Sequence, residues 1–132
     1  MAIIASFRDL DVYKLAREQA KRIFTVSKSF PSEEKYSLTD QIRRSSRAVN
    51  AMVAEAWARR RYPAAFANKI DEALGEATET QAWLDHAYDC EYVDRKQHRE
   101  LDDAWQHVGA MLNRMIERAD DFCKSARKGP RG

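Results

Sequence analysis

The stretch DRKQHRELDDAWQHVGAMLNRMIERADDF, residues 94–122, decides the fold class. Its apolar and small side chains recur in alternating steps of four and three residues, at Leu101, Trp105, Val108, Leu112, Met115, Ala119 and Phe122. This period follows one face of an α-helix, and the polar residues between these positions take the opposite face. Asp94 followed by Gln97 supplies a capping pattern at the start. The stretch therefore predicts a long amphipathic helix with one buried stripe.

Three earlier segments repeat this pattern. Residues 9–30 carry the stripe Val12, Ala16, Gln19, Ile23, Val26 and Phe30. Residues 38–56 carry Leu38, Ile42, Ser45, Val49, Met52 and Ala56. Residues 66–87 carry Phe66, Ile70, Ala73, Ala77, Thr80, Leu84 and Ala87. Four long helices with short connections predict an all-α fold, namely an up-down-up-down antiparallel four-helix bundle over residues 1–123, followed by a basic flexible tail over residues 124–132.

Local signals mark the helix boundaries. The segments Ser6–Asp9 and Ser37–Asp40 have the form of capping boxes for the first and second helices, although residues 31–34 could add an earlier turn to the second. Pro31 disfavours helical geometry in the residue before it and should end the first helix. Pro63 suits the first turn of the third helix.

Composition supports a helical domain and excludes several other classes. The chain has 132 residues, of which 44% are hydrophobic and 33% charged, as in a globular protein of one domain. It contains only four Gly and three Pro, too few for the turns of a β-sandwich or the Gly-rich turns of a Rossmann fold. Two cysteines without a CxxC spacing indicate a reducing compartment, and no stretch is apolar enough to span a membrane. We expect a cytoplasmic protein.

Motifs that would carry out chemistry are missing from the sequence. A di-metal bundle needs Glu-x-x-His pairs, and none occurs. The sequence also has no Gly-rich phosphate loop, no Gly-x-Ser-x-Gly and no His-Glu-x-x-His. The three histidines form no recognisable metal-ligand spacing along the chain. We therefore expect a non-enzymatic protein without a cofactor or a metal.

Charge is unevenly distributed although the formal net charge is only +2. Residues 33–62 hold seven Lys/Arg against four acids, whereas residues 63–92 hold one Lys against seven acids. Basic clusters on one chain can bind nucleic acid, especially when copies of the chain repeat them. The candidate contacts are Arg43, Arg44, Arg47, Arg59, Arg60, Arg61, Lys124, Arg127 and Lys128. The alternative for the first three is that they form salt bridges to the third helix, in the same chain or in another copy.

The side of the second helix opposite its apolar stripe carries small residues, Ala51, Ala54 and Ala58. Small residues allow a second backbone to approach closely, so this side is a candidate interface between copies. Trp83, which lies off the stripe of the third helix, is the fourth candidate. The alternatives are a solvated helix face rich in Ala for its helix propensity, and a tryptophan at the margin of the core.

Several short motifs resemble a known family. They are Phe7–Val12, Phe30–Pro31 with Glu34 and Tyr36–Leu38, Gln41–Arg44, and Ala54–Glu55. In this order they resemble the four-helix-bundle proteins encoded in intervening sequences of bacterial 23S rRNA genes, the S23-type proteins, over residues 7–122. Where the family usually has Ser-Ile-Pro-Ala-Asn-Ile-Ala-Glu-Gly, this chain has residues 48–56, AVNAMVAEA, and lacks the corresponding Pro, Asn and Gly.

The resemblance implies a homo-oligomer, a ring of five, with no established enzymatic activity. The related accessory proteins of diversity-generating retroelements are basic pentameric bundles that bind nucleic acid and a reverse transcriptase. The resemblance therefore implies association with RNA as the leading function. The alternative is a protein adaptor for a nucleic-acid enzyme such as a reverse transcriptase, without direct RNA binding.

Overall fold

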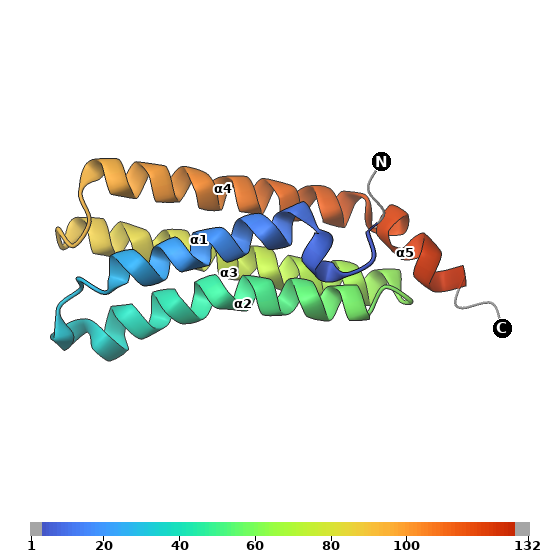
Figure 1. The fold of residues 1–132 in the computed structure, drawn as a ribbon, viewed down its shortest axis with the longest axis horizontal. Helices are drawn as coiled ribbons and strands as arrows, with labels where there is room; N and C mark the ends of the chain where they lie inside the picture. The colour runs from blue at the N-terminus through green and yellow to red at the C-terminus, as the bar shows by residue number, and fades with distance from the viewer. Residues whose placement is uncertain (1–3, 129–132) are drawn as a thin grey trace.

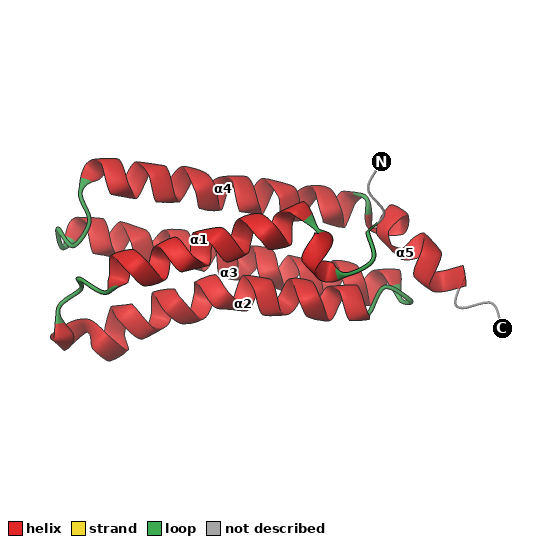
Figure 2. Cartoon of the chain, in the orientation of Figure 1, coloured by secondary structure: helices red, strands yellow, loops and turns green. Residues whose placement is uncertain are grey.

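The computed structural model describes residues 4–128, with side chains as far as residue 124, and shows four long helices and a short fifth one (Figure 1). They are α1 (Asp11–Ser27), α2 (Asp40–Ala58), α3 (Pro63–Asp89), α4 (Arg95–Glu117) and α5 (Ala119–Lys128). Figure 2 shows helices joined by short loops, and no strand occurs within the described range. The all-α prediction is confirmed.

Consecutive long helices run antiparallel and form a four-helix bundle, as the sequence predicts (Figure 1). Each of α1 and α3 packs against both α2 and α4, and α3 makes the more extensive contacts with these two neighbours. All seven residues of the α3 stripe, from Phe66 to Ala87, are buried. Because α1 contacts α4 less closely, a surface groove remains between these two helices.

The core contains one large aromatic residue from α4 and one polar pair between α2 and α3. Trp105 is fully buried, and its indole Nε1 has no hydrogen-bond partner among the described residues. Ser45 and Thr80, also fully buried, lie 2.8 Å apart at their hydroxyl oxygens. A hydroxyl that is buried without a partner is costly, and here one hydroxyl donates to the other while a backbone carbonyl, of Ile42 at 3.3 Å or of Glu76 at 3.0 Å, accepts the remaining proton.

The first two helices begin differently from the sequence prediction. Ser6 and Asp9 form the predicted capping box, but it caps a single 3-10 turn, η1 (Phe7–Asp9), ahead of α1. The capping box predicted at Ser37–Asp40 is wrong. The chain enters α2 through a 3-10 turn, η2 (Ser32–Glu34), and a π-helical turn, η3 (Lys35–Thr39), so the backbone N–H groups there are already inside helical turns and need no side-chain cap.

The starts of α3 and α4 agree with the sequence. Pro63 occupies the first turn of α3. At the start of α4, the Asp94 carboxylate accepts a hydrogen bond from the Gln97 backbone N–H at 2.7 Å, and the Gln97 side chain accepts one from the Asp94 N–H at 2.9 Å. This reciprocal pair is the predicted capping box.

The C-terminal segment departs from the prediction of a continuous fourth helix that reaches Phe122. The helix breaks at Arg118, and α5 turns away to pack against α3. Phe122 stacks on Phe66 of α3 with ring centroids 5.9 Å apart, and Cys123 is fully buried. These two side chains hold α5 to the bundle, and its helix continues to Lys128. Residues 129–132 of the predicted tail lie outside the described residues.

Candidate nucleic-acid interface

A basic groove lies between α1 and α2. It has a volume of about 330 Å³ and is lined by Tyr13, Arg17, Ala20, Lys21, Phe24, Arg47 and Asn50. Three of these seven side chains are cationic, two are aromatic and none is acidic. A polyanion that enters this groove therefore meets positive charge next to aromatic rings.

Phe24 organises the cations at one end of this groove. The guanidinium carbons of Arg43 and Arg47 lie 4.7 and 5.5 Å from the centroid of its ring, and the Lys28 ammonium lies 4.9 Å from it. A cation is attracted to the negative face of an aromatic ring, which partly offsets the repulsion among three like charges. Arg43 is also fixed, because its Nε donates a hydrogen bond of 2.8 Å to the Ser27 hydroxyl.

The other end of the groove is held by a contact between side chain and backbone. The Asn50 amide donates a hydrogen bond of 3.0 Å to the backbone carbonyl of Tyr13, which ties α2 to the first turn of α1. The Tyr13 ring is half-buried and meets Phe7 edge to face, with centroids 5.0 Å apart. The basic groove is therefore built on fixed elements at both ends.

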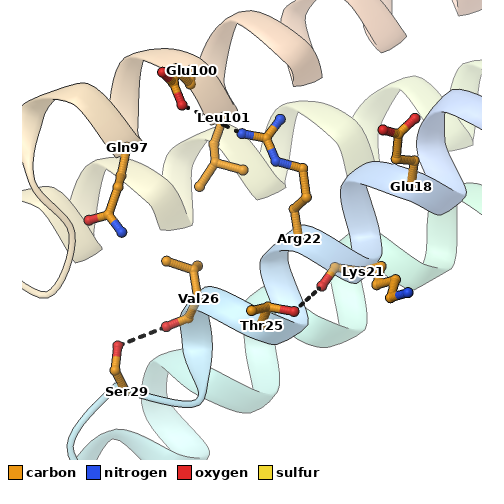
Figure 3. A pocket seen from close by; sticks show the side chains of 9 residues that line it. All are labelled: Glu18, Lys21, Arg22, Thr25, Val26, Ser29, Gln97, Glu100 and Leu101. Atoms are coloured by element: carbon orange, nitrogen blue, oxygen red, sulfur yellow. Dashed lines mark hydrogen bonds and ion pairs between the residues drawn. The ribbon is translucent and has the colours of Figure 1, made fainter.

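A larger groove between α1 and α4 has a different character (Figure 3). Its volume is about 610 Å³, and its lining includes two carboxylates, Glu18 and Glu100, with the cations Lys21 and Arg22. Arg22 and Glu100 approach each other across it at 3.8 Å, above the apolar side chains of Val26 and Leu101. Because its charges balance, this groove does not favour an anion.

The structure separates the three arginines that the sequence places on one side of the second helix. Arg43 and Arg47 lie against α1, whereas Arg44 points to α3 and pairs there with two carboxylates. Its guanidinium contacts Glu76 at 3.2 Å and also contacts Glu79. Successive helical residues point about 100° apart, so neighbours on α2 can face different helices. Among the described residues of a single chain, Arg44 is therefore the one of the three that forms salt bridges to the third helix.

The arginines at the turn between α2 and α3 also differ from one another. Arg60 already has partners within the chain. Its Nε donates a hydrogen bond of 2.8 Å to the Trp57 carbonyl, and its guanidinium carbon lies 3.5 Å from the Trp57 ring centroid. Burial lowers the pKa of the Arg60 guanidinium from its ordinary value. Arg59 and Arg61 are exposed at the same end of the bundle as α5, which carries the exposed Lys124 (Figure 1). The side chains of Arg127 and Lys128 lie outside the described residues.

Comparisons with known proteins place this chain in a family. The family of 23S rRNA-intervening sequence proteins matches residues 8–114. The chain belongs to that family. A solved structure of a protein with unknown function from the S23 ribosomal protein family, from Bacteroides thetaiotaomicron VPI-5482, is 31% identical in sequence, with a TM-score of 0.72. The match covers 80% of this chain and 95% of that one. No curated protein matches the chain.

In this member of the 23S rRNA-intervening sequence family, the three alanines predicted to lie opposite the apolar stripe of α2 are outside the core. Ala51 and Ala58 are exposed and Ala54 is half-buried. Trp83 is half-buried and packs against the core, with its ring 5.9 Å from that of His86. Its indole Nε1 is buried and has no partner in the described part of the chain. Trp83 thus lies at the margin of the core within the single chain.

Five of the seven residues that line the basic groove come from α1, and none of these five was among the residues predicted from the sequence. Tyr13, Arg17, Lys21, Phe24 and Lys28 follow one another in steps of four, four, three and four. This is the helical period of a single face, so a search for cations and aromatic residues at that spacing could have found them.

No helix in the described part of this family member is long and apolar enough to cross a lipid bilayer.

Proposed function

We propose that this chain is a non-enzymatic protein that binds RNA along the basic groove between α1 and α2. The main support for this proposal is a row of cations. Lys28, Arg43 and Arg47 surround the Phe24 ring, and Arg17 and Lys21 continue the row along the groove. Phosphate groups release counterions when they meet such a row of cations. Aromatic rings and guanidinium planes add stacking surfaces for unpaired bases, so single-stranded RNA is the expected ligand.

Two further features support this assignment. The basic groove lacks carboxylates among its lining residues, whereas the larger groove between α1 and α4 contains two. The name of the family refers to intervening sequences of 23S rRNA, which gives its members an RNA context but names no ligand. The charge of the groove is therefore the main support for RNA as the ligand.

Self-association would give the oligomer one basic groove for each copy of the chain. Ala51 and Ala58 are short, exposed side chains on the outer side of α2, so a second chain can approach the backbone there. In a closed ring every copy presents the same groove, and weak contacts then add up along one RNA. We propose a homo-oligomer, with the number five coming from the family resemblance.

The test is an RNA titration followed by fluorescence anisotropy over a series of salt concentrations. The variant Arg17→Ala/Lys21→Ala/Arg47→Ala removes three cations that line the groove. The matched control Arg95→Ala/Lys96→Ala/Arg99→Ala removes three exposed cations from α4, with the same change in net charge. We expect the groove variant to bind more weakly and to lose about 2 from the slope of log K against log salt, at about 0.7 per phosphate contact on a single strand.

The control variant should keep both the affinity and the slope of the wild type. If both variants lost the same RNA affinity, net charge alone would explain binding, and the proposal that RNA lies in the basic groove would be wrong. Absence of wild-type binding at about 50 mM salt, where phosphate contacts are strong, would contradict RNA binding altogether. Capture of a reverse transcriptase in that case would support the adaptor function.

A further inference from the structure

A second cluster of polar side chains lies at the end of the bundle where α3 turns into α4. Asp85 comes from the last turns of α3, and His98 and Asp102 come from the first two turns of α4. One potential ligand atom from each of the three side chains lies within 4.8 Å of the other two. His98 Nε2 is only 2.8 Å from Asp85 Oδ1.

The three side chains can converge on one ion. His98 and Asp102 are four residues apart on α4, so they project from the same face of the helix. Asp85 reaches the same point from the facing helix. The three atoms are one imidazole nitrogen and two carboxylate oxygens, a donor set that zinc and similar divalent transition metals accept. Ligand atoms around tetrahedral zinc lie about 3.3 Å apart, so small side-chain rotations suffice.

Outer contacts orient two of the three ligands. The Gln81 amide donates hydrogen bonds to Asp102 Oδ1 at 3.2 Å and to Gln106 Oε1 at 3.1 Å. The Tyr88 ring lies against the His98 imidazole, with centroids 5.1 Å apart. Such outer partners restrict the orientation of a metal ligand and raise metal affinity. The His98 side chain is only 22% exposed, whereas Asp85, at 67%, is free to adjust.

We propose that Asp85, His98 and Asp102 bind a divalent transition metal, with zinc as the probe, and that the metal links α3 to α4. Three protein ligands leave a fourth position for water. In the absence of a metal, two of these side chains contact each other, since His98 Nε2 and Asp85 Oδ1 lie within hydrogen-bond distance. This site is separate from the basic groove, since none of its residues lies on α1 or α2.

The experiment is isothermal titration of Zn²⁺ into the full chain, prepared without a polyhistidine tag, with Co²⁺ absorption as a second readout. We expect one Zn²⁺ per chain, a tetrahedral Co²⁺ spectrum and a higher Tm with Zn²⁺. His98→Ala and Asp102→Asn should each lower the affinity by at least about tenfold. All three positions lie on the bundle surface, so circular dichroism should show these variants folded.

Matched controls use neighbouring groups outside the cluster. His107→Ala and Asp103→Asn replace exposed residues of α4, and Cys90→Ser removes an exposed thiol close to the turn. All three should bind Zn²⁺ as the wild type does. The proposal is overturned if the wild type binds no Zn²⁺, if His98→Ala binds it unchanged, or if Cys90→Ser abolishes binding.

Discussion

Neighbouring arginines on α2 have different electrostatic roles because they face different helices. Arg44 meets the carboxylates of Glu76 and Glu79, so its charge is already compensated within the chain. Arg47 is exposed and lies in the basic groove near the Phe24 ring. Its charge faces solvent and is available for a phosphate group. The count of arginines therefore overstates the charge available to an RNA.

This difference gives a prediction for two matched substitutions. Arg47→Ala should weaken RNA binding and reduce the slope of log K against log salt by about 0.7, the value for one phosphate contact on a single strand. Arg44→Ala removes the same side chain three residues away and should leave both quantities unchanged. Anisotropy titrations at several salt concentrations measure the slope. A larger loss for Arg44→Ala than for Arg47→Ala would refute this assignment.

A second residue-scale prediction concerns Tyr92 after the turn between α3 and α4. Its hydroxyl donates a hydrogen bond of 2.9 Å to Glu34 Oε2, and this bond, with desolvation and the negative charge of Glu34, raises the pKa of Tyr92 from 10.0 to about 12. The folded chain then keeps this proton at a pH where the unfolded chain loses it. The contribution of Tyr92 to stability is complete below pH 10 and declines as the pH rises from 10 to about 12.

The phenolate absorbance of the wild type, minus that of Tyr92→Phe, isolates this group. Its midpoint should lie well above the ordinary value, and Glu34→Gln should bring it down because the acceptor loses its charge. A midpoint near the ordinary pKa of tyrosine in the folded wild type would show that the hydrogen bond to Glu34 is absent in solution.

At the scale of elements, the end of α3 contains a strained residue. Glu91 has φ of 63°, the left-handed conformation that glycine adopts most easily. Around it, the Tyr92 N–H donates to the Ala87 carbonyl at 2.8 Å and the Glu91 N–H to the Tyr88 carbonyl at 2.9 Å. These two bonds form a Schellman motif with glutamate in the place of glycine.

Glu91→Gly should therefore stabilise the fold, by about 0.5–1 kcal/mol, because it removes the clash of Cβ with the backbone in this conformation. Glu91→Ala keeps the Cβ and serves as the control, with little change in stability. Urea unfolding measures both variants. If the alanine variant gained as much as the glycine variant, loss of the carboxylate and not backbone strain would be the cause.

The periodic stripes of the sequence predict the four long helices because burial of one face determines a long helix. The stripe on α3 is buried at all seven predicted positions. The apolar stripe does not predict where a helix ends when tertiary packing sets that boundary. The stripe continues from Met115 to Phe122, but the helix breaks at Arg118 and α5 packs on Phe66. The basic groove was predicted only in part, because its cations come from two helices and a single stretch of sequence shows only one of them.

For the whole molecule, the charges of α2 and α3 are partly satisfied inside one chain. Besides Arg44, Lys69 pairs with Glu55 at 3.1 Å and with Glu72 at 2.8 Å. The opposite charges of these helices thus explain the packing of one chain and need no second copy. The exposed alanines of α2 are therefore the feature that supports self-association.

Ala51→Glu tests that face with little effect on the single chain, since Ala51 is exposed while Ala54 is half-buried. We expect light scattering to show an oligomer for the wild type and a smaller species for Ala51→Glu, because a carboxylate buried between chains is costly. Circular dichroism should remain unchanged. A wild type that is monomeric at micromolar concentration, or a variant of unchanged mass, would contradict the interface.

If RNA lies on the face formed by α1 and α2, photo-crosslinking will locate it there. Single-stranded RNA with photoreactive uridines is irradiated in complex with the wild-type chain, and the crosslinked peptides are identified by mass spectrometry. We expect crosslinks in residues 11–28 and 43–50, near Tyr13 and Phe24, and we expect them to disappear in Arg17→Ala/Lys21→Ala/Arg47→Ala. Crosslinks confined to α3 and α4, or none at saturating RNA, would contradict it.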